Sequence, residues 1–188
     1  MLPLSVRIFL NVSLACISTL SFNATAAQQP VVRADRVELT LAGAKAAIAA
    51  SLLQAESMGV RVNVAVVDNG GHLLAFARMD GARPSSVYTS ITKATAAATQ
   101  RAPTGPLRPD DPSSTHLNLA IEQAAAASGG KFTTLKGGVP IVFGDQVIGA
   151  VGDGGATGEQ DAEVAIAGVA EVLKGISAME LGPLDRPR

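Results

Sequence analysis

The sequence from Gly137 to Gly168, GGVPIVFGDQVIGAVGDGGATGEQDAEVAIAG, carries the clearest structural signals of the chain. Pro140 lacks a backbone donor, so it suits only the start or the edge of a strand. A Gly144-Asp145 turn separates the apolar run 141–143 from a second run, 146–151, as in a β-hairpin. This stretch therefore predicts an antiparallel strand pair.

A glycine-rich segment and a capped helix follow the hairpin. The four glycines between Gly149 and Gly155 predict a bend that another backbone or a ligand can approach closely. Thr157 and Gln160 have the spacing of a capping box, which predicts a helix start. The inward face of that helix is predicted from apolar residues at helical spacing, namely Ala162, Ala165, Ile166, Val169 and Leu173.

The first 26 residues have the pattern of a secretory signal peptide. Arg7 is the only charge before Arg33, residues 8–20 are apolar, and a small-x-small site ends at Ala26. We therefore expect cleavage after Ala26 and a periplasmic or secreted protein.

Two alternatives for this segment remain open. A membrane anchor requires a longer apolar run than one broken by Asn11 and Ser13. A lipoprotein would use Cys16, but Ser13 stands where such signals favour leucine. After cleavage we expect a flexible leader at 27–38, one domain at 39–175 and a flexible tail at 176–188.

The composition excludes several classes of function. Cleavage would remove the only cysteine and one of 15 basic residues, so the net charge would change from −1 to −2. A nearly neutral surface argues against nucleic acid and anionic lipid as main partners, and we expect no membrane span in the mature chain. Without cysteine the mature chain has no thiolate metal site, and we expect no zinc.

The remaining elements follow from caps, turn residues and apolar periodicity. A first helix begins after Thr40, has Leu41 and Ile48 on its apolar stripe, and ends near Gly59. A hairpin at 60–78 and a helix at 84–100 follow. A loop with four prolines at 102–113, a helix at 116–127 and an extended segment at 131–136 come next. Two hairpins with helices packed on them predict an α+β sandwich with an antiparallel sheet.

An ordered set of short motifs resembles the GlcG/HbpS family over roughly residues 38–173. The motifs are Val64–Asp68, Gly70–Leu73, Arg78–Ala82, Lys93-Ala94, Arg101–Thr104, Gly137–Ile141 and Gly158–Asp161. The resemblance implies a two-layer, profilin- or PAS-like α/β sandwich that forms dimers and larger assemblies. It also implies an exported haem-binding protein with weak haem-degrading activity, because the secreted branch of the family binds haem.

The chain departs from the family pattern in two places. The family often has Gly-Val-Ser-Gly where this chain has Gly-Asp-Gly-Gly at 152–155, and the proline-rich loop replaces a more helical segment. Both departures are close to the expected site, so they bear on the ligand more than on the fold.

Three residues are candidate iron ligands. His72 and His116 are the only histidines, and the resemblance offers Thr104 as an iron-side residue. Each also has an ordinary interpretation: His72 as an exposed turn residue, His116 as a solvated residue at a helix start, and Thr104 as a loop cap.

Arg78, Lys93 and Arg101 are candidate partners for carboxylate groups of a ligand. The alternative is that they form ion pairs within the protein, with Asp68, Asp80 or Glu159. The glycine cluster lacks the Lys-Ser/Thr of a P-loop, so we expect no nucleotide. No nucleophile–base pattern assigns catalytic residues.

Three functions remain: haem binding, binding of a small carboxylate as in the glycolate-linked branch of the family, and an oligomeric accessory role without a ligand. For a bound ligand, we expect a position between the 84–100 helix and the glycine bend, with Lys93, Arg101 and Thr104 around it. We expect a homo-oligomer, because small apolar side chains exceed what one domain covers.

Overall fold

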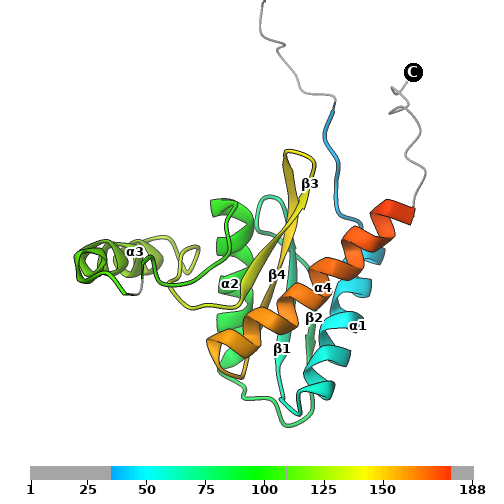
Figure 1. The fold of residues 1–188 in the computed structure, drawn as a ribbon, viewed down its shortest axis with the longest axis horizontal. Coiled ribbons are helices and arrows are strands. Elements are labelled where there is room, and N and C mark those ends of the chain that lie inside the picture. The colour runs from blue at the N-terminus through cyan, green and yellow to red at the C-terminus, as the bar shows by residue number, and fades with distance from the viewer. Residues whose placement is uncertain (1–34, 109, 179–188) are drawn as a thin grey trace, which may run out of the picture. The chain divides into compact units, whose positions relative to one another are not determined.

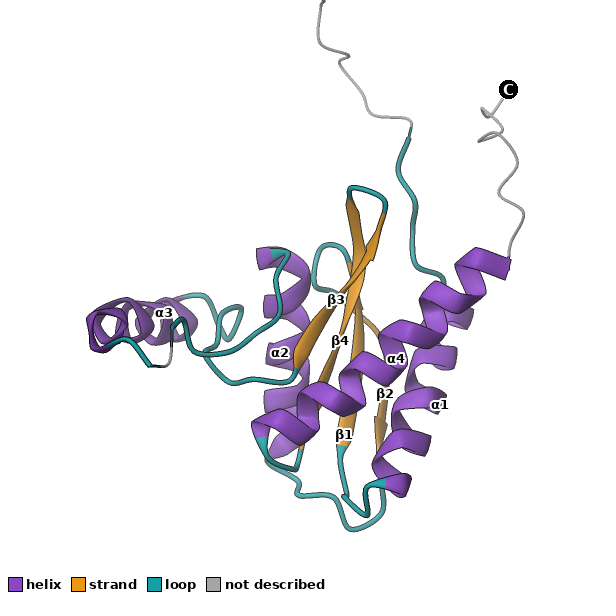
Figure 2. Ribbon diagram, viewed as in Figure 1, coloured by secondary structure: helices purple, strands orange, loops and turns teal. Residues whose placement is uncertain are grey.

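The protein is a four-stranded antiparallel sheet covered by helices (Figures 1 and 2). A computed structural model describes residues 35–108 and 110–178, so the predicted signal peptide lies outside the described residues. The elements in chain order are α1 (Leu41–Ser57), β1 (Asn63–Asp68), β2 (Leu73–Arg78), α2 (Ser86–Gln100), η1 (Pro112–Ser114), α3 (Thr115–Ala127), β3 (Gly138–Phe143), β4 (Gln146–Gly154) and α4 (Gly158–Ala178).

The sheet has the strand order β2-β1-β4-β3, and every neighbouring pair is antiparallel. The two predicted hairpins form its two halves, and β1 and β4 join them at the centre. In this central pair Val66 lies opposite Val151 and Asn63 opposite Gly154. The α+β class and the antiparallel sheet are therefore confirmed.

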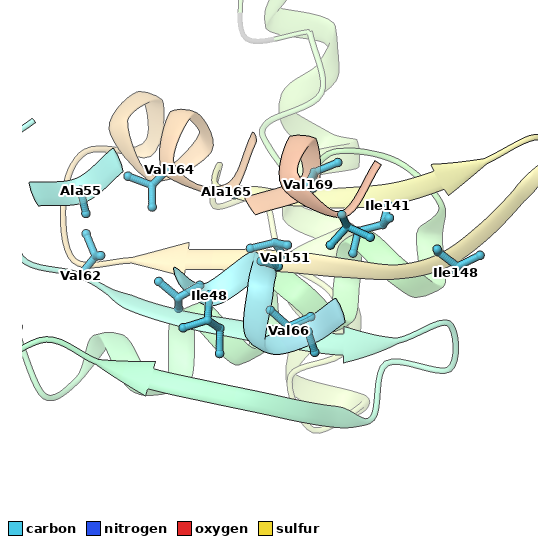
Figure 3. Close-up of a cluster of buried hydrophobic side chains, with 14 residues drawn as sticks. Ile48, Ala55, Val62, Val66, Ile141, Ile148, Val151, Val164, Ala165 and Val169 are labelled. Carbon is cyan, nitrogen blue, oxygen red and sulfur yellow. The ribbon is translucent and has the colours of Figure 1, made fainter. Parts of the chain in front are cut away.

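One face of the sheet packs on α1 and α4, and the main apolar core lies between these layers (Figure 3). Ile48 of α1, Val66 and Val151 of the central strands, and Val164 of α4 all belong to this core. The two helices also pack closely on each other, because Gly168 has no Cβ to collide with Ser51 and the carbonyl of Ala47.

The opposite face of the sheet packs on α2 mainly through small residues, with Ile91 at the side of the contact. Ala65, Val67 and Ala150 of the central strands meet Ala94 and Ala97 of the helix. Helices therefore cover both faces, as the strands that are apolar on two sides require.

The glycine-rich segment is a strand and not the predicted bend. β4 continues to Gly154, and only Gly155 turns the chain, with a φ of 140°. A Cβ at Gly152 would lie 2.3 Å from the backbone nitrogen of Ala94 and from the carbonyl oxygen of Ser90. Gly152 and Gly154 are therefore needed because α2 lies almost directly on the strand.

The helix ends follow the predicted caps. Thr40 Oγ1 accepts from the Gly43 N–H at 3.1 Å, and Gly59 has a positive φ. Thr157 and Gln160 form the predicted reciprocal capping box, with distances of 3.2 and 3.3 Å. α4 continues to Ala178, beyond the expected end of the domain at 175.

Some predicted burial is wrong. Ile166 and Leu41 were expected to face the core, but they are 55% and 50% exposed. The buried face of α4 contains the predicted Ala165 and Val169, together with Val164, Gly168 and Val172. A pattern of apolar residues alone did not fix which side of α4 faces the core. Small residues such as Gly168 make the contact with α1, and they carry little weight in such a pattern.

Part of the predicted leader packs on the domain. The Val37 N–H donates to Gln146 Oε1 at 3.2 Å, and Gln146 Nε2 donates to the carbonyl of Asp35 at 2.9 Å. Val37 also packs against the main core. Within residues 35–108 and 110–178, no helix is both long and apolar enough to cross a membrane.

The third helix differs from the others. None of the side chains of α3 is buried, and Leu117 and Leu119 are 51% and 58% exposed. Figure 1 shows α3 to one side of the sheet, next to the loop that contains the prolines. Asn118 fixes that loop through two hydrogen bonds to the backbone of Leu107.

Candidate functional site

A pocket of about 150 Å³ lies where α2, the segment before β3 and the start of α4 meet. Thr89 and Lys93 line it from α2, Lys136 from the segment before β3, and Gly158 and Asp161 from α4. Its shape depends on the turn at Gly155–Thr157, which carries the chain from the end of β4 into the capped helix. The pocket therefore lies at the positive end of the α4 dipole.

Lys93 crosses the end of the sheet and joins the two helical layers. Its side chain is 5% exposed, and its Nζ lies 2.6 Å from Asp161 Oδ2 and 2.8 Å from the carbonyl oxygen of Asp153. The other oxygen of Asp161 accepts from the Ala156 N–H at 3.0 Å. An ammonium has three donors, so Lys93 retains one beyond these two bonds. Its partner is Asp161, not the predicted Asp68, Asp80 or Glu159.

Asp153 is a second buried carboxyl group close to this ion pair. It is 0% exposed, and neither carboxyl oxygen has a hydrogen-bond partner among the described residues. Burial, followed by the nearby charge of Asp161, raises the pKa of Asp153 to about 8. Asp153 is therefore mostly protonated at neutral pH, which avoids two adjacent buried negative charges.

Thr104 has a structural position next to β3. Its Oγ1 accepts from the Gly138 N–H at 2.8 Å, and its own N–H donates to the Gly138 carbonyl at 2.9 Å. The residue is 8% exposed. These two bonds attach the loop after α2 to the first residue of β3, in agreement with the capping interpretation.

The two histidines are exposed and lie on different elements. His72 follows the β1–β2 turn with an 82% exposed side chain, and its Nδ1 lies 3.1 Å from Asp68 Oδ2. Backbone and side-chain hydrogen bonds from His72 outweigh partial burial and lower the pKa of Asp68. His116 lies in the first turn of α3 and is also exposed.

The remaining predicted cations do not line the pocket. Arg78 is exposed at the end of β2, on the edge of the sheet. Arg101 is exposed and ends α2 with a φ of 58°. Of the predicted site residues, the pocket contains only Lys93.

The predicted position of the ligand needs a correction. Helix α2 fills the space against Gly152 and Gly154, so no ligand fits between them in this structure. The pocket begins at Gly155, the last residue of the predicted segment, so it overlaps the predicted position only at that end. Sequence reasoning missed the roles of Asp153 and Asp161. One signal was available in the sequence: Lys93 has no acidic residue near it on its own helix, which indicates that its partner comes from another element.

Arg83 lines the pocket but was not among the residues predicted from the sequence. Its Nε donates to Ser86 Oγ at 2.9 Å, and its carbonyl accepts from Asn63 Nδ2 at 3.2 Å. These bonds fix the residue in front of α2. The described residues contain no group of three or more histidine, cysteine or acidic side chains that could hold a metal ion.

Similar proteins of known structure share this fold. A double mutant of Streptomyces reticuli HbpS is 32% identical, with a TM-score of 0.59 over 77% of this chain and 97% of that one. A PduOC:heme complex is 25% identical, with a TM-score of 0.58 over 72% and 95% of the two chains.

Sequence comparison gives the same relationship. Protein GlcG of Escherichia coli strain K12 is 40% identical over 117 residues, which are 62% of this chain and 81% of GlcG. The family model described as haem degrading protein HbpS-like matches residues 39–170. The resemblance inferred from the motifs is thus confirmed, and the chain belongs to the HbpS-like family.

Proposed function

We propose that this protein binds haem. The similarity to a relative whose structure contains haem is the observation that carries the proposal, and the description of the family agrees with it. Weak haem-degrading activity is part of the proposal and rests on that description alone.

His72 fits an axial iron ligand better than the other candidates do. The Asp68 carboxylate accepts from its Nδ1–H, which fixes the tautomer and leaves Nε2 facing away from the acid. Such a hydrogen bond also orients the imidazole ring for metal binding. Thr104 is buried and its hydroxyl already accepts from Gly138 N–H, whereas no hydrogen bond to a carboxylate is described for His116.

The pocket at the start of α4 is too small to enclose haem. The pocket at α4, at about 150 Å³, is below the roughly 300–1,000 Å³ of sites that enclose drug-sized ligands. We therefore propose that the bulk of the haem lies outside this pocket, on a surface that a second copy would cover. The exposed apolar side chains of α3, Leu117 and Leu119, support a homo-oligomer.

Export to the periplasm or the medium is the third part of the proposal. The signal-like pattern of residues 1–26 supports it. Mass spectrometry of the exported protein should give a chain beginning after Ala26, and an intact Met1 would contradict the expectation.

A hemin titration followed by absorbance tests the main proposal. We expect a Soret band that saturates with protein, and His72→Ala should shift the band and weaken binding. His116→Ala serves as the matched control, because it removes the other exposed histidine. Haem loss under a reductant and oxygen, compared with free hemin, tests degradation. No saturable Soret band would exclude haem binding.

A further inference from the structure

We propose that the pocket between α2 and the start of α4 binds the carboxylate of a small organic acid. The pocket brings together three basic side chains from three segments that are distant in the sequence: Arg83 before α2, Lys93 within α2, and Lys136 before β3. Asp161 is the only acidic residue in the lining. The lining therefore has a net positive charge of two, in a protein whose net charge is −1.

The buried Lys93 makes this a built site rather than a surface patch. The residue is 4% exposed, and its ammonium is fixed by an ion pair with Asp161 and a hydrogen bond to the carbonyl of Asp153. This ion pair neutralises the charge of Lys93 in part but leaves it one donor for a ligand. Because its geometry is fixed by two short contacts, a ligand does not have to order a flexible lysine.

The two other basic residues lie at the mouth of the pocket. Arg83 uses Nε on Ser86, so its four other N–H donors are available for bidentate contact with a carboxylate. Lys136 Nζ lies 3.5 Å from Glu159, whose side chain is 77% exposed. Such an exposed pair is weak and screened by salt, so an incoming anion can replace it.

Helix α4 adds a backbone contribution. The N–H groups of Gly158 and Glu159 lie in its first turn and have no carbonyl four residues earlier within the helix. The macrodipole of this 21-residue helix favours an anion at the same position. Helix end and basic side chains thus act on the same small volume.

The rest of the lining selects an organic acid over an inorganic anion. Leu135, Ala156 and the methylene stem of Lys136 supply apolar surface next to the cations. The pocket volume of about 150 Å³ accommodates a carboxylate with a few carbon atoms. The carboxylate has two possible sources, a free small acid or a propionate of haem that lies partly outside the pocket. The second source is an alternative to iron ligation by His72, because His72 lies at the end of β1 opposite Gly149 and the pocket lies at the end opposite Gly154.

Calorimetric titration of the purified protein with acetate, succinate and phosphate at constant ionic strength tests the proposal. We expect the organic acids to bind more tightly than phosphate, and Lys136→Gln and Arg83→Gln each to weaken them about five- to tenfold. Lys136→Arg should retain most of the affinity. Lys174→Gln is the matched control, since it removes an exposed lysine near the other end of α4 and should change affinity less than about twofold.

Hemin and its dimethyl ester separate the two sources. If a propionate occupies the pocket, the ester binds more weakly than hemin, and Lys136→Gln abolishes this difference. If a free acid is the ligand, acetate or succinate binds and both haem forms behave alike. Either result supports the site, and the first titration is independent of haem binding. Tighter phosphate binding, equal effects of Lys136→Gln and Lys174→Gln, or no response to acids or esterification would overturn the proposal.

Discussion

Helices α2 and α3 are both rich in alanine, yet their environments are opposite. α2 has seven buried residues, including Ala94 and Lys93, whereas α3 has none. The difference comes from what lies opposite each helix. α2 faces Gly152 and Gly154 of β4, and the absent side chains allow its backbone to approach the strand. No strand among the described residues offers α3 such a surface.

The comparison shows that small side chains lead to close packing only where both contacting elements carry them. Alanine in a helix gains burial where glycine or alanine faces it, and the same composition remains exposed elsewhere. The close contact between α2 and β4 also brings Lys93 within ion-pair distance of Asp161. The packed helix therefore positions part of the pocket. The following predictions test this contrast between the packed helix α2 and the exposed helix α3.

The largest effect is expected from Lys93→Met. The variant leaves the Asp161 carboxylate buried without its ion-pair partner, which should lower the free energy of unfolding by about 3–5 kcal/mol. Lys93→Met combined with Asp161→Asn removes the unpaired charge and keeps an acceptor for the Ala156 N–H, so it should recover much of the loss. Urea unfolding measures both. A single variant as stable as the parent would contradict the role of the buried pair.

Gly152→Ala should be the next most damaging change. The new Cβ would lie 2.3 Å from the backbone of Ser90 and Ala94, and backbone cannot move aside as a side chain can. We expect a loss of about 2–4 kcal/mol in the free energy of unfolding. Ala126→Val on the exposed helix α3 is the control, with a cost of about 0.5 kcal/mol. Similar losses in both variants would remove the distinction between α2 and α3.

Asp153 gives the packed region a dependence on pH. Its pKa is raised to about 8 in the folded protein from 3.8, so folding takes up a proton between these values. The parent should be most stable relative to Asp153→Asn below about pH 4. It should lose up to about 1.4 kcal/mol per pH unit as the pH rises towards 8, and little more above it.

Urea midpoints at about pH 5, 7 and 9 for the parent and Asp153→Asn measure this effect. We expect the variant to gain about 1–3 kcal/mol over the parent between the lowest and the highest pH, after allowance for relaxation and water entry. A difference that is independent of pH would show that Asp153 does not titrate in this range in the folded state.

The sequence was sufficient for the order of the elements and for most of their ends. Thr40, the Thr157–Gln160 capping box and the Gly144 turn act through neighbours within a few residues, so local sequence contains their full physical cause. The predicted bend at Gly149–Gly155 was wrong because the cause is not local. Two of those glycines, Gly152 and Gly154, accommodate helix α2, which lies some 60 residues away in sequence. No pattern along β4 distinguishes a helix from a ligand.

The candidate site was less predictable for the same reason. Lys93 was selected from the sequence as a ligand-binding candidate and lines the pocket, but its partner Asp161 and the nearby Asp153 come from other elements. Arg101 was expected on the same side of α2 as Lys93, yet it lies beyond the helix with a left-handed backbone. Regular helical spacing no longer applies once a cap residue leaves the helix.

The smallest effect on stability is expected on α3, where Leu117→Gln and Leu119→Gln test the exposed side of the comparison. Both side chains are more than half exposed, so the free energy of unfolding of one copy should change by less than about 0.5 kcal/mol. If α3 contacts a second copy, as we propose, the same changes bury an unpaired amide in the interface and weaken association. Light scattering should then give a lower mass for the double variant than for the parent at equal concentration.

Leu53→Gln on α1 is the control, because Leu53 is 66% exposed and belongs to a helix that already packs on the sheet and α4. An unchanged mass in the α3 variant, or an equal loss with Leu53→Gln, would remove α3 as the contact between copies.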